Sequence, residues 1–326
     1  MVRILTSDDV RPLLKMTDVL TVVEDAIVAQ GAGRVERPDR PHFPVGYGLD
    51  VNRPLEPMGT GLVMSAYVHG TDYFATKIAS VHPDNPRRGF PTTSAQIAVN
   101  DAATGQPVAY MDGTHVTGAR TGSVGGLAVR ELTDGPVRVA VVGAGVQAQW
   151  QVRAIDAATT IESVVFHSPH ERSRTGVAET MRNELDVDAA PVDDVGAAVS
   201  DVDVVVTATT SHEPVFPGDA LAEGTVVVGI GSYTDEMQEI DRTTFDRSSQ
   251  VFADVPKAVE DIGDIQQAGL AGDDLIPFAD LLSGTVDPTD GITIVESVGS
   301  VVMDVATASY VVDRARERDV GEEVPF

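Results

Sequence analysis

The chain has 326 residues, with 50 Asp and Glu against 23 Lys and Arg, a formal charge of −27 and no cysteine. The lack of cysteine excludes disulfides, thiolate metal sites and a cysteine nucleophile. The acidity argues against nucleic acid or an anionic membrane surface as a partner, because both require clustered Lys and Arg. With 42% hydrophobic residues, the chain has enough apolar material for two domain cores.

The charge is dispersed along the chain and is poor in lysine, since Lys15, Lys77 and Lys257 are the only three. This pattern favours a protein adapted to concentrated salt, and an ordinary acidic cytosolic protein is the alternative. No segment approaches the roughly 20 apolar residues of a membrane span. The N-terminus turns acidic at once and lacks the apolar stretch of a signal peptide. We therefore expect a soluble, cytoplasmic protein.

The first third of the chain predicts two helices followed by a meander of strands. Ser7 and Thr17-Asp18 are typical helix N-caps, and the second helix is expected to end near Gly31 and Gly33. A helix capped by Thr114 is expected to run to about Leu132. Residues 35–60 are rich in Pro and Arg and are expected to form loop or edge strand, and strands are predicted at 61–68, 73–82, 93–101 and 107–112.

From residue 137 onward, strands and helices alternate. A buried strand at 137–142 precedes a glycine-rich turn and an amphipathic helix. Alternation of this kind predicts a doubly wound parallel sheet. The expected fold class is α/β, with a doubly wound (Rossmann) domain at 119–298 and an α+β domain built from 1–118 and 299–326. Further strands are expected at 163–166, 203–207, 225–229 and 292–295, with helices near 171–184 and 297–318.

The turn after the strand at 137–142 predicts a dinucleotide site. Gly143-x-Gly145-x-x-Ala148 follows a strand and opens a helix. The first Gly permits a tight turn, the second lets the backbone approach a pyrophosphate, and the small third residue allows the helix to pack on the strand. The N–H groups at the start of the helix would then receive the phosphates.

The preference between NAD(H) and NADP(H) depends on the end of the second strand. A carboxylate there would bind the ribose 2′-hydroxyl. The chain instead has His167 and Ser168 at this point, with Arg172 and Arg174 just beyond. Cations at this position could meet a 2′-phosphate, which favours NADP over NAD, although both arginines could equally be solvated helix residues.

Several motifs together resemble the ornithine cyclodeaminase/mu-crystallin family. They are the segments 77–86 (KIASVHPDNP) and 89–92 (GFPT), 111–114 (MDGT), Thr117-x-x-Arg120-Thr121-Gly122, the loop at Gly143, and 293–299 (TIVESVG). The motifs occur in family order and span most of the chain. The family includes ornithine cyclodeaminase, an archaeal type of alanine dehydrogenase and ketimine reductases. Because its members typically dimerise through the non-Rossmann domain, the resemblance implies a homodimer and places substrate binding and dimerisation in that domain.

The resemblance implies that Arg40, Lys77 and Arg120 bind the carboxylate of a small amino-acid or imino-acid substrate, and it adds Val298 to the substrate contacts. A guanidinium binds a carboxylate bidentately, and a lysine adds a point charge. The scarcity of lysine in this chain favours a substrate-binding role for Lys77. The alternative is that Lys77 is a solvent-facing lysine at the end of a strand. Arg40 shares its loop with other arginines, and Arg120 could be a helix surface residue.

The resemblance also implies a set of contacts with the dinucleotide. Thr209 follows the predicted strand 203–207, at the carboxyl edge where such ligands bind. Each hydroxyl in the set could instead be an ordinary capping group. The predicted cofactor contacts are Thr92, Arg120, Gly143, Gly145, Val146, Gln147, His167, Ser168, Arg172, Thr209, Gly231 and Ser297.

The sequence departs from the family in the turn after the strand 225–229. Ornithine cyclodeaminases and archaeal alanine dehydrogenases have a catalytic Asp where this chain has Tyr233, and Asp235 two residues later could compensate. At a nearby position, where the family has a Lys that contacts the cofactor, this chain has Met237. Deaminating ornithine needs a carboxylate to handle protons, and tyrosine is a poor base near neutrality. The catalytic candidates are therefore Lys77, which like water could supply a proton, together with Tyr233 and Asp235.

These observations predict an NAD(P)-dependent reductase or dehydrogenase of a small imino or amino acid. Reducing a preformed imine needs a carboxylate clamp, a hydride placed at the imino carbon and one proton, so the substitution at Tyr233 affects this reaction least. Cyclic ketimine reductase and alanine dehydrogenase both remain open. Ornithine cyclodeaminase and a non-catalytic mu-crystallin-like binding protein are the alternatives. The seven histidines show no metal-ligand spacing, so no metal is expected.

Overall fold

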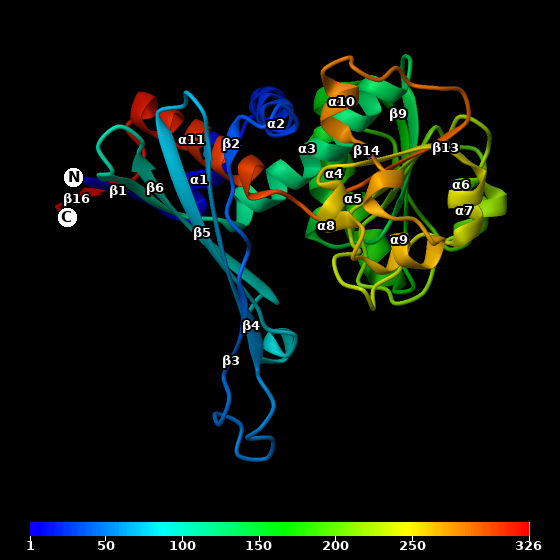
Figure 1. Cartoon of the computed structure of the whole chain (residues 1–326). Coiled ribbons are helices and arrows are strands. Elements are labelled where there is room, and N and C mark those ends of the chain that lie inside the picture. Colours follow the sequence, from blue (N-terminus) through cyan, green and yellow to red (C-terminus); the bar gives the residue numbers. More distant parts are fainter. Residues whose placement is uncertain (326) are drawn as a thin grey trace. The chain divides into compact units, whose positions relative to one another are not determined.

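The computed structural model describes residues 1–325 and divides into two compact units (Figure 1). Unit 1 comprises Met1–Arg120 together with the C-terminal segment from Val301 onward. Unit 2 comprises Thr121–Ser300. Among the described residues, no helix is both long enough and apolar enough to cross a bilayer.

Unit 1 is built on one mixed sheet of eight strands in the order β16-β1-β7-β6-β5-β4-β2, with β3 also paired to β4. The pair β1–β7 is parallel and the other neighbours are antiparallel. The β3–β4 hairpin extends beyond the rest of this unit (Figure 1). The strands are β1 (Val2–Leu5), β2 (Val35–Glu36), β3 (His42–Val45), β4 (Gly59–Val68), β5 (Tyr73–Val81), β6 (Thr93–Asp101), β7 (Pro107–Asp112) and β16 (Glu322–Val324).

Helices pack on this sheet to form the core of unit 1. Helix α11 contacts α2, β4 and β5. The resulting core joins the buried faces of the central strands, such as Ile97 and Met111, to Val305 and Val312 of α11. The helices are α1 (Ser7–Val10), α2 (Met16–Gly31), α11 (Val301–Arg318), the first turns of α3 (Thr114–Leu132), and the 3-10 turns η1 (Arg11–Leu13) and η2 (Asn85–Arg88).

Unit 2 is a parallel sheet of eight strands in the order β10-β9-β8-β11-β12-β15-β13-β14. All neighbouring strands are parallel, and helices connect them, as expected for a doubly wound fold. The strands are β8 (Val137–Val142), β9 (Ile161–His167), β10 (Ala189–Val192), β11 (Val204–Thr207), β12 (Val226–Gly229), β13 (Ser248–Ala253), β14 (Ile276–Pro277) and β15 (Ile292–Glu296). The helical segments are α4 (Val146–Ala158), α5 (Glu171–Leu185), α6 (Val195–Val199), α7 (Arg242–Arg247), α8 (Pro256–Val259), α9 (Gly263–Ala268), α10 (Phe278–Leu282), η3 (Gly218–Ala220) and η4 (Gly272–Asp274).

The central strands of unit 2 end on one common line. Val142 pairs with His167 and with Thr207, Thr207 with Gly229, and Gly229 with Glu296. The chain runs outward from β8 through β9 to β10 and then returns to β11 on the other side of β8. This reversal makes the end of β8 the topological switch point, where a crevice for a ligand opens in doubly wound sheets. The predicted α/β fold class is confirmed.

The helix starts differ from those expected. Thr6, rather than Ser7, caps α1, and it forms a capping box with Asp9. Helix α2 begins at Met16, so Thr17 lies inside its first turn. Helix α11 begins at Val301 rather than at 297, because the chain turns first through Gly299, whose φ is +81°.

Several short edge strands have no predictive pattern in the sequence. Strand β16 is polar, and it pairs with β1, at the opposite end of the sequence. The pairing includes an ion pair of 2.6 Å between Arg3 Nη2 and Glu323 Oε1. Strand β10 has four residues and β14 has two. Such strands depend on a distant partner rather than on a local apolar pattern.

Candidate active site

Lys77 occupies a core-facing position in the middle of β5. Side chains alternate along a strand, and Tyr73, Ala75, Lys77 and Ala79 form the buried face of β5. Lys77 pairs with residues in the middle of the neighbouring strands, and only 3% of its surface is exposed. The alternative of a solvent-facing lysine at a strand end therefore does not hold.

Two cations of unit 1 converge on a single carboxylate. The Nζ of Lys77 donates a hydrogen bond of 2.8 Å to Oδ1 of Asp304, in the first turn of α11. The Nε of Arg120, on α3, donates one of 3.2 Å to the same oxygen. Asp304 is 1% exposed and Arg120 is 9% exposed. Two cations that share one anion leave an excess positive charge, which suits binding of an anionic ligand.

Burial and neighbouring charges set the pKa of these groups. Burial lowers the pKa of Lys77 from 10.5 to about 8, Asp304 opposes this change, and the charges of Arg120 and Arg40 add to it. Burial raises the pKa of Asp304, but Arg120 and Lys77 outweigh burial and hold that pKa below its usual value. Asp304 is therefore ionised at neutral pH, and Lys77 gives up its proton more readily than an exposed lysine.

Arg40 lies in the exposed segment between β2 and β3. Its charge contributes to the lowered pKa of Lys77, and also to that of His42, where burial is the larger cause. The structure thus places Arg40 and Arg120 where the charge of each acts on Lys77, and all three residues belong to unit 1. Thr92, also in unit 1, is exposed, and its carbonyl accepts a hydrogen bond of 2.8 Å from the His82 N–H.

The glycine-rich loop of unit 2 has the local geometry of a phosphate cradle. Gly143 has a φ of +128°, and a Cβ there would collide with the carbonyl of Ala208. Gly145 is the N-cap of α4, and a Cβ on it would meet open space. That space and the first N–H groups of α4 are what a pyrophosphate needs. Val146 is 62% exposed beside it.

Two buried polar atoms beside this loop have no hydrogen-bond partner among residues 1–325. They are Oε1 of Gln147 and Nδ1 of His167. Buried polar atoms are normally satisfied, so an unsatisfied pair beside a cradle for an anion fits a site that is completed by a ligand. The residues present therefore fit a dinucleotide.

The two arginines after β9 have different surroundings. Arg174 donates a hydrogen bond of 2.9 Å to the carbonyl of Ser168 and forms an ion pair of 2.7 Å with Asp193. Arg172 is exposed and forms no ion pair within residues 1–325. Ser168 is buried, and its Oγ accepts a hydrogen bond from the His170 N–H. Arg174 thus fixes the turn, whereas Arg172 has its charge available to a ligand.

Glu239 holds the loops that follow β11 and β12. Its carboxylate accepts hydrogen bonds from Oγ1 of Thr207 at 2.9 Å, the N–H of Thr209 at 2.5 Å and the N–H of Gly231 at 2.7 Å. A Cβ on Gly231 would collide with this carboxylate and with the carbonyl of Thr209. Two predicted cofactor contacts, Thr209 and Gly231, are thus held by one buried acid.

Asp254 holds the loop after β15 in the same way. It accepts hydrogen bonds from Oγ of Ser297 at 2.6 Å, the N–H of Val298 at 3.4 Å and the N–H of Gly299 at 2.8 Å. The hydroxyl of Ser297 is therefore already engaged as a donor, and it can offer a ligand only its lone pairs.

Two further acids, Asp264 and Glu296, are buried at this edge of the sheet. Burial raises the pKa of Glu239 to about 7 and that of Asp264 to about 6, although hydrogen bonds to both acids oppose it. Burial raises the pKa of Glu296 well above its usual value, and the charges of Asp264, Glu239 and Asp254 raise it further. Neither carboxyl oxygen of Glu296 has a hydrogen-bond partner among residues 1–325.

Tyr233 and Asp235 lie in the segment after β12 in unit 2. Both are exposed, with 52% of the surface of Tyr233 accessible. Met237 is buried at 4% exposure, and its carbonyl accepts a hydrogen bond from Ser232. The catalytic roles of Tyr233 and Asp235 stay predictions.

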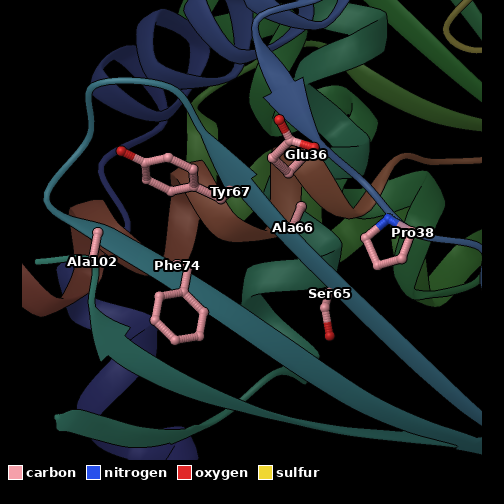
Figure 2. Close-up of a pocket in the computed structure, with 7 residues that line it drawn as sticks. All are labelled: Glu36, Pro38, Ser65, Ala66, Tyr67, Phe74 and Ala102. Atoms are coloured by element: carbon pink, nitrogen blue, oxygen red, sulfur yellow. The ribbon is translucent and has the colours of Figure 1, made fainter. Parts of the chain in front are cut away.

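An open hollow of about 390 Å³ lies on the sheet of unit 1 (Figure 2). Its lining is mostly apolar and contains no Lys or Arg, so it does not match the carboxylate site. Among residues 1–325 there is no group of three or more His, Asp or Glu arranged to hold a metal ion. The lining residues are Glu36, Pro38, Ser65, Ala66, Tyr67, Phe74 and Ala102.

The sequence did not predict the buried acids whose carboxylates accept hydrogen bonds from the predicted site residues. Asp304 is an acid within an apolar stretch, Val301-Val302-Met303-Asp304-Val305, and this break in pattern is the signal that could have revealed it. Glu296 similarly ends an apolar strand. The roles of Asp254 and Glu239 depend on loops distant in sequence, and no local signal marks them.

Comparison with known proteins identifies the family. The sequence profile of the ornithine cyclodeaminase/mu-crystallin family matches residues 2–319. A Delta(1)-pyrroline-2-carboxylate reductase of Bacillus cereus is 27% identical over an alignment of 333 positions that covers 99% of each chain. The structure of Thermococcus litoralis Delta(1)-pyrroline-2-carboxylate reductase in complex with NADH and L-proline has a TM-score of 0.90 at 28% identity, covering 99% of this chain and 100% of that one. An archaeal alanine dehydrogenase dimer with bound NAD has a TM-score of 0.89 at 27% identity, covering 100% and 99%.

The family profile spans nearly the whole chain, and these relatives align over almost their full lengths. The motifs on which the resemblance was based lie in both units. The protein is therefore a member of the ornithine cyclodeaminase/mu-crystallin family.

Proposed function

We propose that this protein reduces the C=N bond of a small cyclic imino acid, of the Delta(1)-pyrroline-2-carboxylate type, with a nicotinamide dinucleotide as the hydride donor. The predicted class, an oxidoreductase of small imino or amino acids, is confirmed by relatives named as Delta(1)-pyrroline-2-carboxylate reductases and alanine dehydrogenase. The proposal commits to the cyclic ketimine within that class.

The observation that carries the proposal is the cation cluster of unit 1. Lys77 and Arg120 share one buried carboxylate, and the charge of Arg40 reaches Lys77. An excess positive charge in a buried setting recognises an anion, and an imino acid presents a carboxylate beside its C=N bond. Lys77, Arg120 and Arg40 would bind this carboxylate and so fix the position of the imino carbon.

The dinucleotide site would lie at the carboxyl edge of the sheet of unit 2. Gly143 and Gly145 leave room for the pyrophosphate. The unpaired Oε1 of Gln147 is an acceptor, so it would pair with a hydroxyl or amide donor of the dinucleotide and not with a phosphate oxygen. When bound, the reduced nicotinamide supplies the hydride for the imino carbon. Two relatives were solved with NADH or NAD. We infer a preference for NADPH here, because β9 ends without a carboxylate and Arg172 is exposed beyond it.

The proposal is tested by a substrate panel followed at the absorbance of the reduced cofactor. The panel contains Delta(1)-pyrroline-2-carboxylate, Delta(1)-piperideine-2-carboxylate, pyruvate with ammonium, and L-ornithine, each with NADPH and with NADH. We expect the cyclic imino acids to give the highest kcat/KM. A higher kcat/KM for pyruvate with ammonium would reassign the protein as an alanine dehydrogenase. Ammonia and proline from ornithine without net cofactor change would identify a cyclodeaminase, and no turnover of any member would favour a binding protein.

We also propose that the protein is a cytoplasmic homodimer that pairs through unit 1. The relative solved as an alanine dehydrogenase dimer supports a dimer. The loop between β3 and β4 is rich in exposed apolar side chains, and large exposed apolar groups are typical of interaction surfaces. Light scattering after size exclusion would give the mass of a dimer, and a monomer at micromolar concentration would contradict the proposal. The exposed side chains are Tyr47, Leu49, Val51 and Leu55, at 54%, 75%, 86% and 89% exposure.

A further inference from the structure

Asp304 lies at a position where a buried helix face would ordinarily be apolar. It belongs to the first turn of α11, and its neighbours Val302, Met303 and Val305 are all at most 2% exposed. A buried carboxylate costs several kcal/mol of desolvation unless charges and hydrogen bonds compensate it. Lys77 and Arg120 provide that compensation through Oδ1. The same contacts constrain both cations.

The contact with Arg120 involves one side of its guanidinium. Arg120 donates to Asp304 through Nε. A guanidinium is a rigid, planar fork, so fixing Nε also fixes the direction of the two terminal nitrogens. The contact with Lys77 likewise fixes the end of a flexible chain, which would otherwise have several rotamers.

Asp304 is also the anion that supports the charge of Lys77. Burial, Arg120 and Arg40 all lower the pKa of Lys77, and Asp304 opposes them through its charge and its hydrogen bond. These charged groups act on Lys77 from α3, from α11 and from the segment between β2 and β3. Without Asp304, burial and the charges of Arg120 and Arg40 would all favour the neutral amine of Lys77. A neutral amine attracts a carboxylate far less than an ammonium group does.

We propose that Asp304 is a positioning residue for the substrate carboxylate: its Oδ1 holds Lys77 Nζ and Arg120 Nε in fixed places and keeps Lys77 cationic. This inference rests on the proposed function, since it assumes that the two cations bind an imino acid. Asp304 itself does not touch the substrate. Its effect reaches the substrate through the geometry and the protonation of the two cations.

The test uses three variants of the full-length protein. Asp304→Asn keeps the shape and removes the charge, and Asp304→Glu keeps the charge and shifts the carboxylate by one methylene. Asp313→Asn is the matched control, because Asp313 lies on the same helix, is exposed and accepts a hydrogen bond from Tyr73. Circular dichroism and thermal melting establish that each variant is folded.

The first readout is the charge of Lys77, measured without any substrate. The chain has three lysines, so 15N-lysine labelling gives three Nζ signals, and Lys77→Met assigns one of them. We expect the pKa of Lys77 to fall by about 1–3 in Asp304→Asn, the range for an opposite charge at hydrogen-bond distance. Asp304→Glu and Asp313→Asn should leave it near 8.

The second readout is the pH dependence of imino-acid reduction. In Asp304→Asn, KM for the imino acid should rise at least about tenfold at pH 8, with a smaller change in kcat, and should recover partly at pH 6, where a larger fraction of Lys77 is protonated than at pH 8. In Asp304→Glu, KM should rise without this recovery, because the charge is kept and the position is lost. A role in folding alone would lower the melting temperature without this dependence on pH.

The two readouts separate the inference from the proposed function. An unchanged Lys77 titration in Asp304→Asn, or an unchanged KM in both Asp304 variants, would overturn the role of Asp304. If the wild-type protein reduced no imino acid, the proposed function would fail, and the titration would still decide whether Asp304 keeps Lys77 charged. If Asp304→Asn does not fold, Asp304→Glu decides: a wild-type KM with a displaced carboxylate would overturn the positioning role.

Discussion

At the residue scale, the unusual feature is a lysine in a strand position that otherwise contributes to a core. Lys77 alternates with Tyr73, Ala75 and Ala79 on the buried face of β5. Burying a charge is unfavourable unless it is paired, and here the pairing is with Asp304. Since two well-packed apolar residues of similar volume are often at least as stable as a buried ion pair, the pair is better explained by binding than by stability.

Replacing Lys77 by Met should therefore affect activity more than folding. The change removes one cation of the clamp and leaves Asp304 with Arg120. Because a truncated buried charge pair costs about 2–5 kcal/mol, we expect kcat/KM for the imino acid to fall by at least about 30-fold. Lys15→Met, at an exposed lysine of a surface ion pair, should have wild-type kinetics. Wild-type kinetics in Lys77→Met would remove Lys77 from the site.

Arg172 provides a test of cofactor preference at the same scale. Arg172→Ala should raise KM for NADPH by about 10–100-fold, since a charge-assisted hydrogen bond to phosphate contributes about 1.5–3 kcal/mol. KM for NADH should stay constant, and it serves as the internal control. An equal rise for both cofactors would mean that Arg172 does not recognise the 2′-phosphate.

The sequence predicted the cationic site residues Lys77 and Arg120, but it did not predict Asp304, the anion to which both donate hydrogen bonds. Lys77 was notable because lysine is rare in this chain, and Arg120 because it lies in a family-like motif. Asp304 carried only a weak signal, one acid among fifty acidic residues. Its importance comes from β5 and α3, which bring two cations to it from more than 180 residues away in sequence. Contacts of such long range are set by packing and not by local pattern.

At the scale of elements, the carboxyl edge of the sheet of unit 2 is held by buried acids. Glu239 fastens the loops after β11 and β12, and Asp254 fastens the loop after β15. The long buried strands and the glycine loop were predictable, because apolar runs and Gly143-x-Gly145 are local patterns. The short strands β10, β14 and β16 and the acid-held loops were not, because each depends on a partner distant in sequence.

The buried acids predict that stability falls as pH rises. Burial raises the pKa of Glu296, so the folded state keeps a proton that the unfolded state loses above about pH 4.5. Glu239 and Asp264, whose pKa values burial raises to about 7 and about 6, act in the same direction. The free energy of unfolding contributed by these groups is thus greatest below pH 4 and decreases as pH rises to 7 and beyond.

Glu296→Gln should weaken this dependence. The variant removes the ionisable group, so the unfolding midpoint of the protein without cofactor should rise at pH 8, by roughly 2–4 °C for each kcal/mol. The midpoint should change less at pH 5. Glu162→Gln, at an exposed acid of β9 in the same unit, is the control and should be neutral. Equal effects of Glu296→Gln at both pH values would contradict a raised pKa.

At the scale of the whole molecule, the charge of −27 acts through self-repulsion. Screening shortens the reach of this repulsion from about 10 Å at 0.1 M salt to about 3 Å at 1 M. We expect the melting temperature to rise when KCl is increased from about 0.1 M to 1 M, and NaCl to have the same effect at equal ionic strength. A melting temperature that stays constant or falls would contradict adaptation to salt and would favour an ordinary acidic protein.

The central step of the proposed reaction is hydride transfer to an imino carbon, and transfer of deuterium tests that step directly. The protein is incubated with Delta(1)-pyrroline-2-carboxylate and NADPH carrying two deuterium atoms at C4 of the nicotinamide, and the product is analysed by mass spectrometry and NMR. We predict proline one mass unit heavier than the unlabelled compound, with deuterium at the α-carbon, and at least a 30-fold slower appearance with Lys77→Met, about 2 kcal/mol. Absence of proline, or proline without deuterium at the α-carbon, would contradict the account.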